Sequence, residues 1–230
     1  MLSHHNILWN AHRSLEMVKC SADELFLSFL PLSHTLERTA GYYLPLMLGA
    51  AVAYNRYIPQ LADDLLAIRP TILVSVPRIF ERVYNKIQAG LEEKSPVARG
   101  LFKLAVAVGW QTFEHRQGRS GWSPRLLLWP LLKTIVAGKV MEKLGGRMRL
   151  AVVGGAPLPG SVARLFIGLG LPMIQGYGLT ETSPVISVNT IEKNDPDSVG
   201  CLLEDVEAKI GDQDELLVRS PGVMLGYWAN

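Results

Sequence analysis

Cysteine is scarce in this chain, and its scarcity excludes two kinds of architecture. The 230 residues include two cysteines, Cys20 and Cys201, which lie far apart and have no metal-ligand spacing around them. A disulfide framework or a zinc-binding module needs more such residues at short, regular spacing. We therefore expect two buried or semi-buried thiols in a reducing, cytoplasmic compartment.

A long apolar run is also lacking. The longest uncharged run extends from Thr39 to Asn55 and contains Gly41, Pro45 and Gly49. It is shorter than the roughly 20 apolar residues that a bilayer-spanning helix needs. The first residues of the chain are polar and do not show the pattern of a secretory signal peptide. We expect the uncharged run to form a buried helix that leads into a strand.

A strong net charge is the third absence, since the chain carries only +2. Hydrophobic residues make up 48% and charged residues 19%, which is typical of a globular protein. Residues 78–149 carry 14 basic and 5 acidic residues. This basic segment could face anionic lipid or the phosphates of CoA or a nucleotide, or it could be the solvated face of amphipathic helices. Nucleic-acid binding is not expected, because the basic residues alternate with leucine and valine at helical spacing and not with exposed aromatic residues.

The chain does contain a regular alternation of strand and helix patterns. Such alternation predicts an α/β fold with a mainly parallel sheet and helices on its faces. Ligands of such sheets collect at the carboxyl ends of the strands. The expected strands are 25–30, 50–54, 71–76, 148–153 and 171–175, and the expected helices are 3–19, 34–48, 60–67, 77–93 and 158–168.

Residues 95–146 interrupt this alternation. Ser-Pro pairs at 95–96 and 123–124 are typical helix starts, so we expect two helices over 97–116 and 124–144. The second is rich in leucine and either packs against the core or faces a membrane interface or an acyl chain. After Pro184 the pattern changes to short β segments. We therefore expect an α/β subdomain over 1–184 with a helical insertion at about 95–146, and the start of a smaller β-rich subdomain over 185–230.

Two glycine-containing segments stand out as candidate ligand sites. The first is Gln175-Gly176-Tyr177-Gly178-Leu179-Thr180-Glu181-Thr182, in which two glycines flank a flat aromatic ring and a hydroxyl precedes a carboxylate. Glycines suit a sharply bent backbone. A hydroxyl beside a phosphate and a carboxylate beside magnesium are what a nucleoside triphosphate requires. The second is Gly154-Gly155-Ala156-Pro157, a turn that follows an apolar strand and brings backbone groups close to a ligand.

These residues resemble the adenylate-forming (AMP-binding) enzymes, which include acyl- and aryl-CoA synthetases, luciferases and the adenylation domains of peptide synthetases. Three further segments match in the right order, so the resemblance covers nearly the whole chain. Val76-Pro77-Arg78-Ile79-Phe80-Glu81 is similar to a stretch of the long-chain acyl-CoA synthetases. The others are Leu30-Pro31-Leu32-Ser33-His34 and the segment from Glu215 to Trp228.

The resemblance implies a role for each motif residue. Tyr177 lies against adenine, Thr180 donates to a phosphate oxygen, and Glu181 holds magnesium, so Thr180 and Glu181 are the catalytic candidates. The nucleotide-binding candidates are Gly154, Gly155, Ala156, Pro157, Gln175, Gly176, Tyr177, Gly178, Leu179 and Thr180. Without the resemblance, Tyr177 could be a core tyrosine, Thr180 a helix cap and Glu181 a solvated surface group.

The acyl pocket is assigned by the same resemblance to His34 and Gly176. A lone histidine near a strand end can equally be a hydrogen-bonded core residue. Glu37, one turn further on, could fix the tautomer of His34.

The implied reaction is ATP-dependent activation of a long-chain fatty acid as an acyl-adenylate, followed by transfer of the acyl group to CoA. ATP, Mg²⁺ and CoA are the implied cofactors and co-substrates, and peripheral membrane contact is left open. The family's phosphate loop and C-terminal domain have no counterpart in these 230 residues, so we expect an internal fragment of a larger ligase. Two alternatives remain: an aryl-CoA ligase or peptide-synthetase adenylation domain, and a non-catalytic nucleotide- or acyl-binding remnant.

Overall fold

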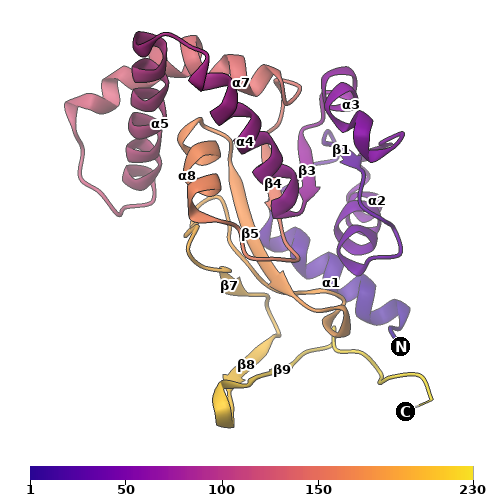
Figure 1. Ribbon diagram of the computed structural model, residues 1–230. Helices are drawn as coiled ribbons and strands as arrows, with labels where there is room; N and C mark the ends of the chain where they lie inside the picture. Colours follow the sequence, from indigo (N-terminus) through magenta and orange to yellow (C-terminus); the bar gives the residue numbers. More distant parts are fainter. Residues whose placement is uncertain (230) are drawn as a thin grey trace.

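The computed structural model describes residues 1–229, which form a three-layer α/β body and a projecting β-ribbon (Figure 1). The strands are β1 (Leu25–Ser28), β2 (Ala51–Tyr54), β3 (Ile72–Ser75), β4 (Leu150–Val153), β5 (Met173–Gly178), β6 (Val185–Val188), β7 (Cys201–Leu202), β8 (Glu207–Ile210) and β9 (Leu216–Arg219). The helices are α1 (His4–Met17), η1 (Glu37–Tyr43), α2 (Leu44–Leu48), η2 (Ile58–Gln60), α3 (Leu61–Ile68), α4 (Pro77–Glu92), α5 (Pro96–Arg116), η3 (Pro124–Leu128), α6 (Trp129–Leu132), η4 (Lys133–Ala137), α7 (Gly138–Glu142), α8 (Gly160–Gly168), η5 (Thr180–Thr182) and η6 (Asp212–Asp214).

The main sheet has the strand order β2-β1-β3-β4-β5-β6-β7 within the described residues. The strands from β2 to β5 pair in parallel, and β6 and β7 pair antiparallel. The predicted α/β fold with a mainly parallel sheet is therefore confirmed.

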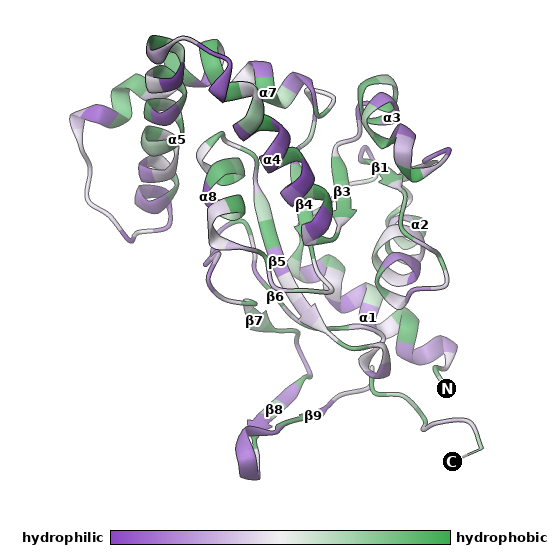
Figure 2. Cartoon of the chain, in the orientation of Figure 1, coloured by the Kyte–Doolittle hydropathy of each residue, from purple (hydrophilic) through white to green (hydrophobic). Residues whose placement is uncertain are grey.

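Both faces of the parallel strands are buried, because alternate residues along each strand point to opposite sides. Phe26, Ile72, Leu150 and Ile174 belong to one core, which contains residues of α1 and α2. Their neighbours Leu27, Leu73, Ala151 and Met173 belong to the other core, which contains residues of α3, α4, α5 and α8. Figure 2 shows the apolar character of β3 and β4 and the hydrophilic residues along much of α4.

The segment predicted as one helix over 34–48 contains an unusually wide turn. Residues Glu37–Tyr43 form a π-helix, and α2 follows with Pro45 in its first turn. A proline inside a regular α-helix loses a hydrogen bond and clashes with the carbonyl group four residues earlier. The wider turn lies where that clash would otherwise occur, and π-turns of this kind are frequent at functional sites.

The helical insertion is present, and its second half is helical throughout residues 124–142. The hydrogen-bond pattern changes along this segment, from 3-10 in η3 to α in α6, π in η4 and α again in α7, and Pro130 lies in the first turn of α6, where a proline is tolerated. Trp129 and Leu132 are buried, whereas Leu127 and Leu131 are exposed. Only part of this segment packs against the core, so peripheral membrane contact stays a prediction. Within residues 1–229, no helix combines the length and apolar character that a membrane crossing requires.

The chain after Pro184 does not leave the main sheet at once. β6 and β7 extend the sheet beyond β5, and the separate ribbon of β8 and β9 begins at Glu207 (Figure 1). The boundary expected at 184 therefore falls between two paired strands, and the division into two domains stays a prediction.

Cys201 on β7 is exposed and Cys20 is half-buried, so the expectation of a buried or semi-buried thiol is wrong for Cys201.

The contact between α5 and α8 is close because both helices carry a glycine there. A Cβ atom added at Gly109 would lie 1.9 Å from the carbonyl oxygen of Gly168 and 2.6 Å from the Trp129 ring. A Cβ at Gly168 would lie 2.6 Å from the carbonyl oxygen of Val106. Backbone atoms cannot yield as a flexible side chain does, so these two glycines set the distance between the helices.

We expect Gly109→Ala to lower the free energy of unfolding by about 1–3 kcal/mol, because the methyl group forces α5 away from α8. Gly100 is the matched control: it lies in the same helix, and nothing lies within 4 Å of a Cβ added there. Gly100→Ala should raise the free energy of unfolding by roughly 0.5–1 kcal/mol through helix propensity. Urea unfolding of the two variants measures both changes, and equal effects would contradict the close packing.

Candidate functional site

A cavity of about 310 Å³ lies on the face of the sheet that α1, η1 and α2 cover. Its floor consists of Phe26, Ile72, Val74 and Val152, which are residues of β1, β3 and β4. Its volume lies at the lower end of the range for small-molecule sites, roughly 300–1,000 Å³. Its apolar floor suits a hydrocarbon group rather than a charged one.

The cavity extends from the carboxyl ends of the strands towards their amino ends. Gly154, Gly155 and the segment from Gly176 to Glu181 line one end, which we call the mouth. Ser14, Val18 and Cys20 line the opposite end, close to the start of β1. The structure therefore joins the motif residues and the apolar interior in one continuous space.

The wall opposite the sheet comes from the segment after β1. Leu36, Ala40 and Leu44 follow one another at four-residue intervals and all line the cavity. Sequence reasoning identified a helix here but did not assign this face to the site. The four-residue spacing was the available signal, since it places side chains on one side of a helix.

The turn after β4 is held in place by a buried glutamine. The Gln175 side chain accepts a hydrogen bond from the backbone N–H of Leu158 at 2.7 Å and donates one to the carbonyl oxygen of Ser198 at 3.3 Å. Gly154 and Gly155 line the cavity, whereas Gln175, Ala156 and Pro157 are not among its lining residues. A direct nucleotide contact for these last three residues stays a prediction, and the role that the geometry gives Gln175 is to fix the turn.

Gly176 and Gly178 lie within a strand and not in a turn. β5 continues through Gly178 and pairs with β6, with an irregular register between Tyr177 and Gly178. The reason for glycine is close approach: a Cβ at Gly178 would lie 1.8 Å from the carbonyl oxygen of Pro184. Tyr177, between the two glycines, is 36% exposed and lines the mouth, so it is not a core tyrosine.

Thr180 and Glu181 lie in η5, a short 3-10 turn that follows β5. The Thr182 hydroxyl caps this turn by accepting a hydrogen bond from the backbone N–H of Leu179 at 3.1 Å. The alternative that Thr180 is a plain helix cap is therefore wrong. The hydroxyls of Thr180 and Thr35 lie 3.4 Å apart at the mouth, so they link the motif to the segment that carries His34.

Glu181 points one carboxylate oxygen at a residue from the far end of the chain. The Tyr227 hydroxyl donates a hydrogen bond to Glu181 Oε1 at 2.8 Å, across 46 residues. A hydrogen bond from its own backbone amide, and then the bond from Tyr227, hold the pKa of Glu181 below its usual value. The sequence placed Tyr227 within a family motif but gave it no role, since nothing in a linear sequence pairs two such distant residues.

His34 lines the mouth, and its assignment to an acyl pocket stays a prediction. Its Nδ1 atom accepts a hydrogen bond from the backbone N–H of Leu36 at 3.2 Å, so the neutral ring carries its proton on Nε2. The expectation that Glu37 fixes this tautomer is wrong, because Leu36 and not Glu37 bonds to the ring, and no hydrogen bond joins the Glu37 carboxylate to His34 among the described residues.

Glu37 is instead a buried carboxyl group inside the π-helical turn, with 1% of its surface exposed. Burial raises the pKa of Glu37 to about 7, and the nearby Ser28 hydroxyl opposes this only in part. Gly41 leaves the space that the carboxyl group occupies, since a Cβ there would lie 2.5 Å from Glu37 Oε1. The turn that forms the cavity wall therefore contains a group that is easier to bury when protonated.

A preformed metal centre is not found among residues 1–229, which contain no group of three or more His, Cys, Asp or Glu side chains able to hold a metal. Glu181 is an isolated carboxylate at the mouth. Zinc sites need three or four protein ligands, whereas magnesium is commonly held by one or two carboxylates together with substrate phosphates. The donor set therefore fits magnesium carried by a nucleotide and does not fit a resident zinc ion.

Comparison with known proteins gives one family for the chain. The family model described as "AMP-binding enzyme" matches residues 1–228. The chain is 35% identical to the long-chain-fatty-acid–CoA ligase FadD15 of Mycobacterium bovis over 90% of this chain and 34% of that protein. It is 31% identical to the peroxisomal long chain acyl-CoA synthetase 6 of Arabidopsis thaliana over 99% of this chain and 33% of that protein. The chain thus spans about a third of the length of these curated relatives.

Solved structures give the same architecture. Apo MatB from Rhodopseudomonas palustris matches with a TM-score of 0.67 and 22% identity, over 100% of this chain and 38% of that one. At this level of identity the likeness shows the fold alone.

Replacing Glu37 by glutamine tests the buried carboxyl group through its pH dependence. Because the folded pKa of about 7 lies above the ordinary value of 4.5, the folded state keeps the proton that the unfolded state has already lost. The native chain therefore loses stability as pH rises between these two values, on the order of 3 kcal/mol in total. Glu37→Gln should remove this loss, so the variant should be the more stable protein at pH above about 7 and should lose that advantage at pH below about 5.

Chemical unfolding at several pH values measures this difference. Glu93→Gln is the control, since Glu93 is an exposed glutamate just after α4. A stability difference between Glu37→Gln and the native chain that does not change with pH would show that Glu37 titrates normally.

Proposed function

Because the chain belongs to the AMP-binding enzyme family, we propose that it forms part of an ATP-dependent ligase that joins a fatty acid to CoA. The observation that carries the proposal is the continuous space between the apolar cavity and the Gly176–Glu181 segment. An acid bound with its chain inside the cavity presents its carboxylate at the mouth, where the nucleotide-binding candidates lie.

The proposed reaction has two steps. A carboxylate oxygen attacks the α-phosphorus of ATP, and the bond between that phosphorus and the pyrophosphate oxygen breaks. The CoA thiol then attacks the acyl carbonyl carbon, AMP leaves with the electron pair of the broken carbon–oxygen bond, and the thiol proton is lost to solvent. Such catalysis depends mainly on positioning and on stabilisation of negative charge, because the reacting groups supply the bonds that form and break.

We assign adenine recognition to the wall formed by Tyr177 and the Gly154–Gly155 turn. Tyr177 is 36% exposed and lines the mouth, so a base in the mouth can reach its side chain. Stacking of a base on an aromatic ring contributes about 1–3 kcal/mol to binding. The two glycines lack side chains that would keep the adenine ring away from the backbone of the turn.

We assign the phosphates to Thr180 and Glu181. The Thr180 hydroxyl is exposed at the mouth and is a donor for a phosphate oxygen. Glu181 is the residue that would hold magnesium, which neutralises phosphate charge when it is bound. Within the proposal, Glu181 contributes an ionised carboxylate that the surrounding hydrogen bonds keep in that form.

A long acyl chain is the proposed substrate class. Aliphatic and aromatic side chains from α2, β1, β3 and β4 line the cavity beyond the mouth, and the polar groups Ser14 and Cys20 lie at its far end. The names of the relatives FadD15 and long chain acyl-CoA synthetase 6 agree with this class. His34 and Thr35 stand at the mouth, where the carboxylate end of the acid would lie.

Glu181→Ala in the full-length ligase tests the assignment. Acid-dependent release of pyrophosphate should fall by about 100-fold or more, because charge on the phosphates is no longer neutralised. Glu93→Ala is the control for loss of one exposed glutamate and should leave the rate unchanged. Pyrophosphate release that continues at the native rate in Glu181→Ala would show that the carboxylate has no part in the first step.

A further inference from the structure

The last residues that the structure describes return to the candidate site. The backbone N–H of Met224 donates to the carbonyl oxygen of Glu181 at 2.7 Å. The Asn6 side chain in α1 donates to the carbonyl oxygens of Pro221 and Val223 at 2.7 and 3.1 Å. We call residues 220–227 the return segment. It is fixed at one side to α1 and at the other to the residue that we assign to magnesium.

The return segment fits closely against this part of the molecule. A Cβ atom added at Gly222 would lie 2.8 Å from the carbonyl oxygen of Thr182 and 2.9 Å from the Trp9 ring. The segment is therefore inserted between η5 and α1. Its position follows from backbone contacts and a glycine, and these contacts do not need the Tyr227 side chain.

Tyr227 itself contributes little to packing. The residue is 57% exposed, yet its hydroxyl reaches Glu181 Oε1 at 2.8 Å. The other carboxylate oxygen of Glu181 makes no hydrogen bond to another residue within the described chain. One oxygen is thus held by a neutral donor, while the other remains available to a cation.

We propose that Tyr227 is a positioning residue that holds the Glu181 carboxylate in place for a nucleotide-bound divalent cation. The inference rests on the proposed function, because it presupposes that Glu181 serves that cation. The main-chain bond from Met224 fixes the backbone of Glu181, and the Tyr227 hydroxyl fixes its side chain. An exposed glutamate otherwise samples several rotamers, so this hydrogen bond reduces the entropy that cation binding would cost.

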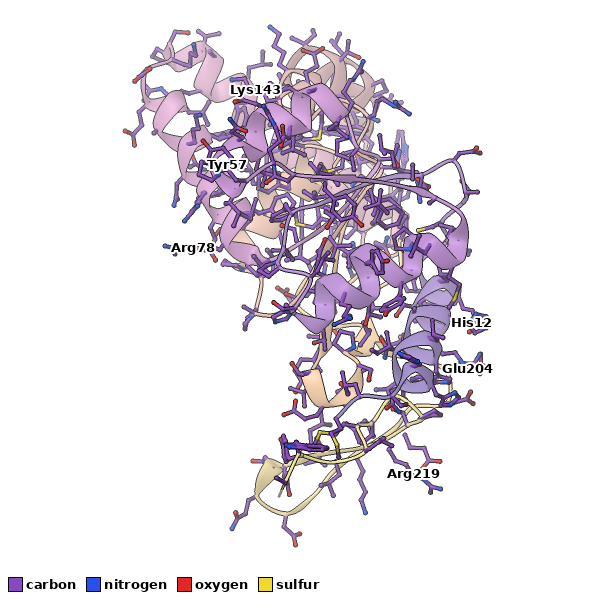
Figure 3. The ribbon with its side chains drawn as sticks, turned by 90° about the vertical axis from the view of Figure 1, so that its right-hand side faces the viewer. His12, Tyr57, Arg78, Lys143, Glu204 and Arg219 are labelled. Carbon is purple, nitrogen blue, oxygen red and sulfur yellow. The ribbon has the colours of Figure 1, made fainter. Side chains whose placement is uncertain are left out.

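The test compares Tyr227→Phe with Tyr57→Phe in the full-length protein. Tyr57 is also exposed, lies between β2 and η2, and has no hydrogen bond through its hydroxyl among the described residues. Figure 3 shows Tyr57 in the upper body of the molecule, far from Arg219 on the projecting ribbon. Both changes remove one hydroxyl group from an exposed ring, so Tyr57→Phe measures the effect of losing a hydroxyl that makes no hydrogen bond within the described residues.

Two measurements separate positioning from folding. The first is titration of Mn²⁺ into the protein in the presence of a non-hydrolysable ATP analogue, and the second is the Mg²⁺ dependence of pyrophosphate release. We expect Tyr227→Phe to weaken Mn²⁺ binding by about 10-fold or more, as removal of a residue that orients a metal ligand does elsewhere. The Mg²⁺ concentration for half-maximal rate should rise by a similar factor, with kcat restored at saturating Mg²⁺. Tyr57→Phe should change neither quantity.

The outcomes distinguish the inference from the proposed function. Equal Mn²⁺ affinity in Tyr227→Phe and Tyr57→Phe, together with a loss in Glu181→Gln, would overturn the role of Tyr227 and leave the proposed function standing. Native Mn²⁺ affinity in Glu181→Gln would overturn the assignment of Glu181 to the cation, and the role of Tyr227 with it. A loss of rate in Tyr227→Phe that saturating Mg²⁺ does not restore would show that the hydroxyl supports the structure of the site rather than the position of the ligand.

Discussion

Burial of both faces of the parallel strands is the constraint on which the rest of the structure depends. Because alternate residues of β1, β3, β4 and β5 point to opposite sides, helices must cover each face. On one side, α3, α4, α5 and α8 pack closely, to the extent that two glycines set the distance between α5 and α8. On the other side, α1, η1 and α2 leave the cavity open. The cavity therefore exists because α1, η1 and α2 do not fill all the space above the face of the sheet that they cover.

The chemistry of the candidate site follows from where the strands end. The turn after β4 and the second half of β5 meet at the same edge of the sheet, so Gly154, Tyr177 and Glu181 come together although the sequence separates them. The Gln175 side chain on β5 accepts a hydrogen bond from the backbone N–H of Leu158, in the segment after β4, and so links the ends of β4 and β5. The segment after β1 adds His34 and Thr35 from the side. The proposed ligands, a hydrocarbon chain with its carboxylate and a triphosphate, need adjoining environments of different polarity, and this edge provides an apolar interior, a polar mouth and an isolated carboxylate.

Much of this arrangement could be predicted from the sequence, and the failures have physical reasons. Apolar runs such as Ile72–Ser75 specify buried strands, and their alternation with helices predicts the parallel sheet. The wide turn at Glu37–Tyr43 was missed, because the pattern of apolar residues is nearly the same in α- and π-helices. Residues 124–142 are helical as expected, but the apolar pattern does not show where the 3-10, α and π hydrogen-bond patterns change. Gly176 and Gly178 lie in a strand, and Gly178 is needed for the close approach of β5 to Pro184, which the sequence does not indicate. The pairing of Tyr227 with Glu181 has no sequence signal at all.

In the proposed function the cavity beneath the motif receives the acyl chain, and filling the cavity tests this directly. Ala40 lines the cavity from η1, and Ala107 is an exposed alanine in α5 that serves as the matched control. The measurement is acid-dependent pyrophosphate release by the full-length protein with fatty acids of increasing chain length. Ala40→Trp should shift the preference to shorter acids while the KM for ATP stays unchanged, and Ala107→Trp should change neither quantity. An Ala40→Trp enzyme that keeps the native chain-length profile would show that the acyl chain binds elsewhere.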